Sequence, residues 1–101
     1  MRLFIASLAL ASAALAGAAN AQSTRLSDSE FVALARCAGL HEGAGVDAEQ
    51  INQELRAARR GRADHVRQQA TSAKAQAEAE VSRASGADAE RLAAERAACA
   101  G

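Results

Sequence analysis

The chain has 101 residues, and its twelve basic and twelve acidic side chains give no net charge. This balance argues against nucleic acid, a polyanion or a membrane surface as a partner bound through overall charge. Only two residues are aromatic, both Phe, and Pro, Trp and Tyr are absent, so the chain can supply one small domain at most.

The first 21 residues have the three-part pattern of a secretory signal peptide. Arg2 gives a positive start, residues 3–19 are uncharged and largely apolar, and small residues occupy the positions that signal peptidase reads. We expect cleavage between Ala21 and Gln22. The uncharged run is at the lower limit for a membrane span and is rich in Ala, so an uncleaved anchor is the weaker alternative.

Cleavage would leave residues 22–101 as one small domain, in which 21 of 80 residues are Ala. Few large apolar side chains remain, so burial alone predicts marginal stability. Cys37 and Cys99 can supply the missing stabilisation, because two cysteines in an oxidising compartment are expected to pair. Neither directly follows the cleavage site, so we expect no stable membrane anchor after cleavage. Basic residues that are almost all Arg, with abundant Ala, favour a GC-rich bacterial source and hence the periplasm.

High Ala, Glu, Gln and Arg content, with no Pro and few β-branched residues, favours an all-α fold. We predict an up-down bundle of three to four helices with short connections. The helices are expected at about residues 27–41, 47–60, 63–84 and 88–100.

Three helix starts carry capping signals. Ser27 with Glu30 three positions later forms a capping box before the first helix, and Asp47 with Gln50 repeats this spacing. Asp88 stands in a similar context and is expected to cap the last helix. These signals place the helix boundaries, but they do not show whether residues 47–84 form one helix or two.

The alternative to the bundle is a long helical hairpin in which residues 47–84 are continuous. Small and apolar side chains stay in phase over this stretch, which favours one helix, whereas Gly61 in a helix interior costs about 1 kcal/mol. A continuous helix would leave Cys99 roughly 25–30 Å from Cys37. A disulfide needs Cα atoms within about 7 Å, so the predicted pairing favours a turn near Gly61.

Cys37 and His41 lie four residues apart on one helix face, a spacing that helical metal ligands use, and His65 could add a third ligand. Pairing of Cys37 with Cys99 would remove its thiolate from such a site. His41 is then a basic residue near a helix C-terminus, where the helix dipole favours it. We therefore predict no metal and no other cofactor, and keep metal binding or sensing as the alternative function.

One concentration of basic side chains could hold an anion or an acidic partner. No aromatic residue accompanies it, which argues against nucleic acid, and a solvated helix face is the simpler interpretation. This patch consists of Arg56, Arg59, Arg60, Arg62 and Arg67.

No motif for catalysis is present, since the chain contains neither a G-x-S-x-G elbow nor a phosphate-binding loop. We expect a protein that is not an enzyme. The leading hypothesis is a small periplasmic helical protein that acts by binding another envelope protein.

Overall fold

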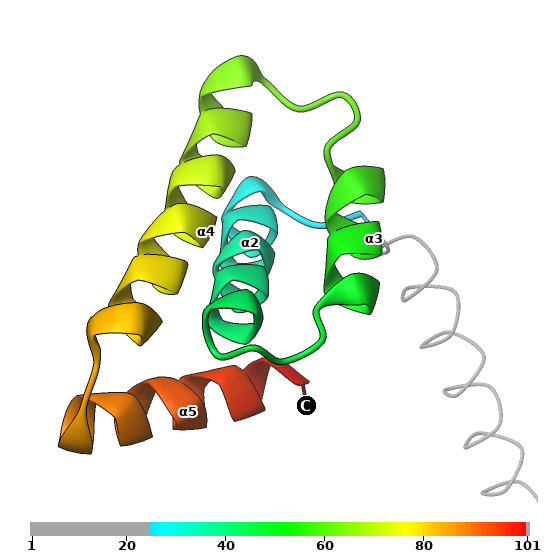
Figure 1. Ribbon diagram of the computed structural model, residues 1–101. Coiled ribbons are helices and arrows are strands. Elements are labelled where there is room, and N and C mark those ends of the chain that lie inside the picture. The colour runs from blue at the N-terminus through cyan, green and yellow to red at the C-terminus, as the bar shows by residue number, and fades with distance from the viewer. Residues whose placement is uncertain (1–24, 101) are drawn as a thin grey trace, which may run out of the picture.

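The computed structural model describes residues 25–100, which form four helices and no strand within that range (Figure 1). The predicted signal peptide and its cleavage site between Ala21 and Gln22 lie outside the described residues. The all-α prediction is confirmed for the described part of the chain. The helices are α2 (Asp28–Gly43), α3 (Glu49–Ala58), α4 (Asp64–Arg83) and α5 (Gly86–Ala100).

The capping box at the start of α2 is present as predicted. The Ser27 hydroxyl accepts from the Glu30 N–H at 3.1 Å, and the Glu30 carboxylate accepts from the Ser27 N–H at 2.8 Å. These two bonds satisfy backbone donors that a helix start leaves without an intrahelical partner. The backbone hydrogen bond from Ser27 is the main reason that the pKa of Glu30 is lowered.

The chain reverses at Gly61, so residues 47–84 do not form one helix. Gly61 has a φ of +75°, in the left-handed region that glycine adopts without steric cost, and it lies between the end of α3 and the start of α4. The long-hairpin alternative is therefore wrong, and the predicted turn is confirmed.

Two predicted helix starts are displaced by two residues. α3 begins at Glu49 rather than Asp47, although the Asp47 carboxylate still accepts from the Glu49 N–H at 2.9 Å. α5 begins at Gly86, so Asp88 lies within its first turn and does not cap it. There Asp88 lies 3.9 Å from Arg91, one turn further along the helix.

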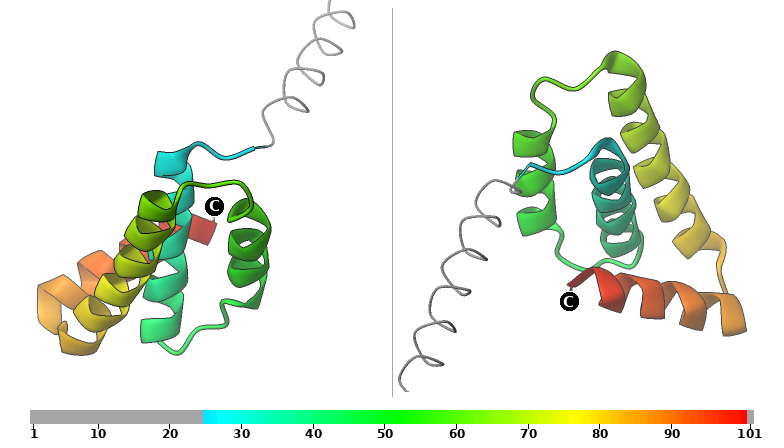
Figure 2. Two further views of the ribbon diagram at one scale, coloured as in Figure 1. Left: turned by 90° about the horizontal axis from the view of Figure 1, so that it is seen from above. Right: turned by 180° about the vertical axis from the view of Figure 1, so that it is seen from behind.

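α2 lies at the centre of the fold, and α3, α4 and α5 each pack against it (Figure 1). α2, α3 and α4 alternate in direction as expected for an up-down bundle, but α5 crosses the end of the bundle where α2 and α4 finish (Figure 2). The backbone is extended at Ala84 and has a positive φ at Gly86, which turns the chain away from α4. Leu92 of α5 then packs with Leu40 and Ala77.

Small residues allow α2 and α4 to pack closely. Ala35 and Ala38 of α2 and Ala70 and Ala77 of α4 are buried. At Gly39 an added Cβ would lie 2.2 Å from the Lys74 carbonyl oxygen, so the two backbones meet there. The Ala-rich composition therefore gives a thin but tightly packed helix pair.

Candidate functional site

A groove separates α3 from α4, and α2 forms its floor. Both flanking helices pack against α2, while their backbones lie apart (Figure 1). Lys74 of α4 reaches across the gap and donates to Asn52 of α3 at 3.3 Å. The groove has a volume of about 390 Å³ and is partly open to solvent. It is therefore a surface over which another molecule could lie rather than an enclosed cavity.

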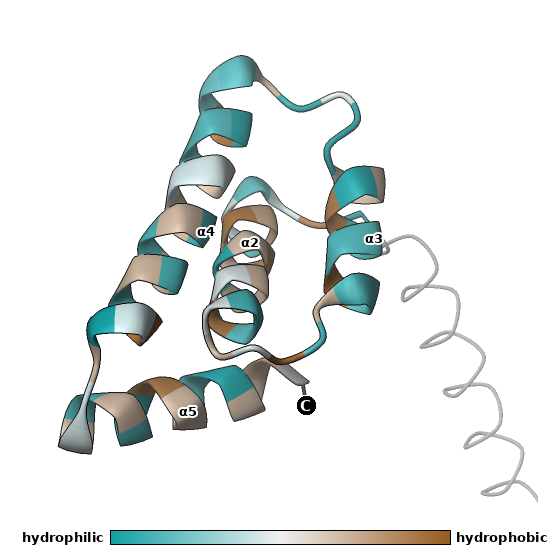
Figure 3. Cartoon of the chain, viewed as in Figure 1, coloured by the Kyte–Doolittle hydropathy of each residue, from teal (hydrophilic) through white to brown (hydrophobic). Residues whose placement is uncertain are grey.

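Apolar side chains form the floor of the groove, but little of their surface is exposed, since Phe31 and Ala35 of α2 are 1 % and 2 % exposed. The hydrophobic side of α3 faces α2 (Figure 3). None of the α3 residues is fully buried, and Leu55 and Ala58 are only partly covered where they pack against the Phe31 cluster. The wall that α3 provides is thus attached to the fold by few apolar contacts. The apolar residues that line the groove are Phe31, Ala35, Leu55 and Ala70.

The rim of the groove is mainly basic. Arg56 of α3 and Arg59, the residue directly after α3, are exposed and line the groove, and neither forms an ion pair with any of residues 25–100. Lys74 of α4 contributes a third positive charge, and Thr71 lies one turn before it. The groove therefore combines an apolar floor with cationic walls.

Glu42, the one carboxylate among the lining residues, is engaged by its neighbours. Its carboxylate lies 3.1 Å from the Lys74 ammonium and accepts from the Asn52 amide at 2.9 Å, while Lys74 also donates to the Asn52 carbonyl at 3.3 Å. The Asn52 hydrogen bond, followed by Lys74, lowers the pKa of Glu42 against the opposing effect of burial. This small network joins α2, α3 and α4 across the groove.

The structure divides the basic patch that the sequence suggested. Arg56 and Arg59 line the groove, and Arg67 lines an adjoining hollow together with Arg59, where it pairs with Asp64. Arg60 is exposed but lines neither of these two surfaces. Three of the five predicted residues thus lie at the groove or directly next to it.

Arg62 does not belong to an exposed patch, and the sequence interpretation of it needs correction. Its side chain is only 3 % exposed and lies over the Phe31 ring at 4.7 Å. It donates to the backbone carbonyls of Leu26 at 2.6 Å and Ala58 at 2.7 Å, and to the Asp28 carboxylate at 2.8 Å. The positive φ of Gly61 turns the chain just before Arg62, which ties the α3–α4 turn to the start of α2.

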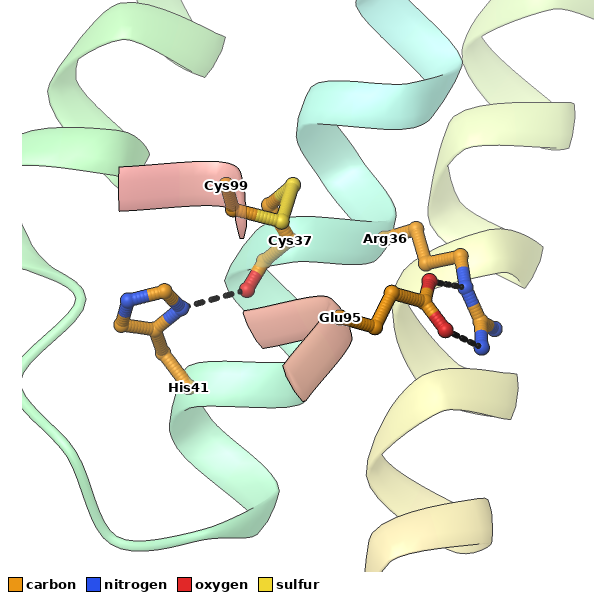
Figure 4. The surroundings of a disulfide bond; sticks show 5 residues. All are labelled: Arg36, Cys37, His41, Glu95 and Cys99. Carbon is orange, nitrogen blue, oxygen red and sulfur yellow. Dashed lines mark hydrogen bonds and ion pairs between the residues drawn. A yellow bond between two sulfur atoms is a disulfide. The ribbon is translucent and has the colours of Figure 1, made fainter. Parts of the chain in front are cut away.

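Cys37 and Cys99 form a disulfide, with Cα atoms 5.9 Å apart, as the sequence predicted (Figure 4). His41 lies beside it and is 8 % exposed, and its Nδ1 is 2.8 Å from the Cys37 carbonyl oxygen. His65, by contrast, is exposed near the start of α4. Residues 25–100 contain no cluster of three metal-ligating side chains, so Cys37, His41 and His65 are not brought together as a metal site.

Arg36 connects three helices through ion pairs that no sequence pattern indicated. Its guanidinium donates to Glu80 of α4 at 3.1 Å. It also donates to Glu95 of α5 at 3.0 Å, and Figure 4 shows this second pair. These bonds raise the pKa of Arg36 and lower the pKa of both carboxylates. Glu80 and Glu95 lie 44 and 59 residues from Arg36 along the chain, so no local spacing predicts either ion pair.

No protein-family model, curated protein or solved structure matches this chain. The groove, its charges and the contacts around it are therefore the basis for any functional interpretation. Within residues 25–100 no helix has both the length and the apolar character needed to cross a membrane.

Proposed function

We propose that this protein is a small, non-enzymatic protein of the bacterial periplasm that binds a helix of another envelope protein in the groove between α3 and α4. The observation that carries the proposal is the groove itself, in which two helices flank a third while their backbones stay apart. Surfaces of this kind accept amphipathic helices, which place side chains between the two walls.

The direction of α5 explains why a helix is the expected occupant. In a four-helix bundle each helix packs between two neighbours. Where two helices flank a third, the fourth helix fills the gap between those two flanking helices. Here α5 crosses the end of the bundle, so it does not fill the position between α3 and α4 (Figure 2). A helix supplied by a partner would complete the bundle.

The hydroxyl groups along α4 support a binding role over a catalytic one. Thr71 donates to the Arg67 carbonyl at 3.1 Å, and Ser82 donates to the Glu78 carbonyl at 2.9 Å. Hydroxyls that bond to their own helix backbone lack the adjacent base that activates a nucleophile. The basic groups in the groove suit recognition of a ligand rather than proton transfer.

Export to the periplasm is supported by the N-terminal sequence pattern and is compatible with the Cys37–Cys99 bond. The intact mass of the protein from the periplasmic fraction, with and without reduction and alkylation, tests both features. We expect a chain that begins at Gln22 and gains two alkyl groups only after reduction. A chain that retains residues 1–21, or that is alkylated without reduction, would contradict the export proposal.

A photo-cross-linking amino acid at Thr71, inside the groove, tests the binding site in cells. The matched control carries the same group at Gln76, which is exposed on α4 and lines a different, shallow face. We expect a discrete adduct from position 71 that maps to a helical segment of one exported protein, with no such adduct from position 76. Equal adducts from both positions, or none from position 71, would contradict a specific binding groove.

A further inference from the structure

We propose that the partner helix in this groove is acidic, with carboxylates one turn apart that pair with Arg56 and Arg59. This inference rests on the proposed function and adds the chemistry of the partner. Its basis is the imbalance of charge at the rim, where two guanidinium groups have no ion pair within the described residues.

The two arginines are placed to act together. Arg59 directly follows α3 with a helical backbone and comes three residues after Arg56, so the two lie on neighbouring positions of one helix face. Carboxylates three or four residues apart on a facing helix have a matching spacing, and a guanidinium can bind a carboxylate through two parallel hydrogen bonds. Arg67, in the adjoining hollow, extends the positive surface, although Asp64 partly offsets its charge.

The single carboxylate in the groove does not neutralise this surface. Glu42 is held by Lys74 and Asn52, so these groups balance one another at one place in the groove. The charge left over comes from Arg56 and Arg59. Complementary charge across such an interface determines which partner binds more than how strongly it binds.

The size of the groove indicates how the partner lies. α3 has ten residues and is therefore about 15 Å long, which matches two to three turns of a facing helix. A volume of about 390 Å³ holds side chains from one helix face but not a whole helix. The partner helix thus lies over the groove and directs small apolar side chains toward Leu55, with its carboxylates at the α3 rim.

Three fluorescein-labelled helical peptides of 14 residues test the charge of the partner. They share an Ala and Leu face and carry Glu, Gln or Lys at two positions four residues apart. Fluorescence anisotropy with the exported, disulfide-bonded protein is expected to show the Glu peptide binding about tenfold more tightly than the Gln peptide. The Lys peptide is expected to bind most weakly, and added salt should reduce the difference.

The double variant Arg56→Glu/Arg59→Glu is expected to reverse this order, so that the Lys peptide binds best. Arg83→Glu/Arg91→Glu is the matched control, because it changes the net charge equally at exposed residues that do not line the groove. Circular dichroism verifies that both variants are folded. An unchanged order in the first variant, or a reversed order in the control, would overturn the proposal.

The two proposals fail in different ways. If no peptide binds while position 71 still forms its adduct, the partner helix is not acidic but the groove remains a binding site. Binding of phosphatidylglycerol vesicles that depends on Arg56 and Arg59, without binding of the Glu peptide, would also overturn the acidic helix. If none of the peptides binds and position 71 forms no adduct, both proposals are wrong.

Discussion

Gly39 shows how one residue controls a close contact between two helices. A Cβ at this position would lie 2.2 Å from the Lys74 carbonyl oxygen and 2.8 Å from the Ala77 Cβ. A backbone oxygen cannot move aside as a flexible side chain can, so α2 and α4 would have to separate. The absence of a side chain at Gly39 is therefore a packing requirement rather than a source of flexibility.

We expect Gly39→Ala to destabilise the protein by about 2 kcal/mol, even though Ala is the better helix former. Gly43→Ala is the comparison, because its Cβ would lie 3.0 Å from the Val81 Cβ and 3.1 Å from the Glu78 backbone, and a shift of a few tenths of an ångström relieves these contacts. Thermal unfolding followed by circular dichroism measures both variants. A Gly39→Ala protein as stable as the parent would contradict the close approach of the two backbones.

Arg62 is the second residue whose role follows from its surroundings. Arg62→Met would leave the carbonyls of Leu26 and Ala58 without their donor, and each unsatisfied buried polar group is costly. The ion pair between Arg62 and Asp28 contributes less to stability than these hydrogen bonds, since the Asp28 side chain is 67 % exposed. We expect a loss of about 2–3 kcal/mol in the free energy of unfolding.

Arg60→Met is the control for this experiment, because it removes an equal charge from an exposed neighbour. It should change the free energy of unfolding by less than about 0.5 kcal/mol. Urea denaturation measures both variants. Equal losses in the free energy of unfolding would show that the stability depends on the charge of this segment and not on the buried position of Arg62.

At the level of the helices, α5 is attached to the fold at few points. Leu92 is buried, Glu95 pairs with Arg36, and Cys99 is bonded to Cys37, whereas most other described side chains of α5 are exposed or partly exposed. Its own packing is therefore weak. The disulfide links α5 covalently to α2.

Reduction of the Cys37–Cys99 bond is expected to destabilise the protein by about 4 kcal/mol in the chain-entropy model, since the bond closes a loop of 62 residues. Because α5 has few other contacts, hydrogen exchange in residues 86–100 should increase more than in α2 or α4. Mass spectrometry of exchanged peptides, with and without reductant, measures this. A Cys37→Ser/Cys99→Ser variant, which should resemble the reduced protein in both conditions, excludes other effects of the reductant.

At the level of the whole molecule, ion pairs connect the central helix α2 to the helices that pack around it. Arg36 joins α2 to α4 and α5, and the Glu42 network joins α2 to α3 and α4. Both networks depend on ionised carboxylates. Stability should therefore depend on pH in the acidic range.

We expect the stability of the protein to fall as the pH drops below about 4.5. Arg36 lowers the pKa of Glu80 and Glu95 from their ordinary value of 4.5, so below that value the unfolded chain binds protons more readily than the folded one. The stability that these carboxylates contribute is present above pH 4.5 and is lost as the pH falls through their folded pKa values.

Arg36→Met should make this pH dependence shallower, because it removes the main cause of both lowered pKa values. Part of the dependence should remain, since Glu30 and Glu42 also have lowered pKa values from other partners. Urea denaturation between pH 3 and 7 measures the slope, with Arg60→Met as the control. A slope equal to that of the parent would contradict the role of Arg36.

The sequence by itself determined the features that depend on local interactions. The capping box of Ser27 and Glu30 lies within four residues. The turn near Gly61 was favoured by the expected Cys37–Cys99 pairing, since the local pattern over residues 47–84 is compatible with one helix, and the structure places Gly61 at positive φ. The pairing of Cys37 and Cys99 was also predictable, because the chain has no other cysteine. Helix content and approximate boundaries followed from composition and these signals.

Only the tertiary structure decided which charges are buried, where α5 lies and where the groove opens. Arg62 and Arg60 have similar sequence surroundings, yet one is buried and the other exposed. Arg36 could have paired with many carboxylates, but the fold brings Glu80 and Glu95 to it. These outcomes depend on contacts between residues far apart in the chain, and local propensity and spacing carry no information about such contacts.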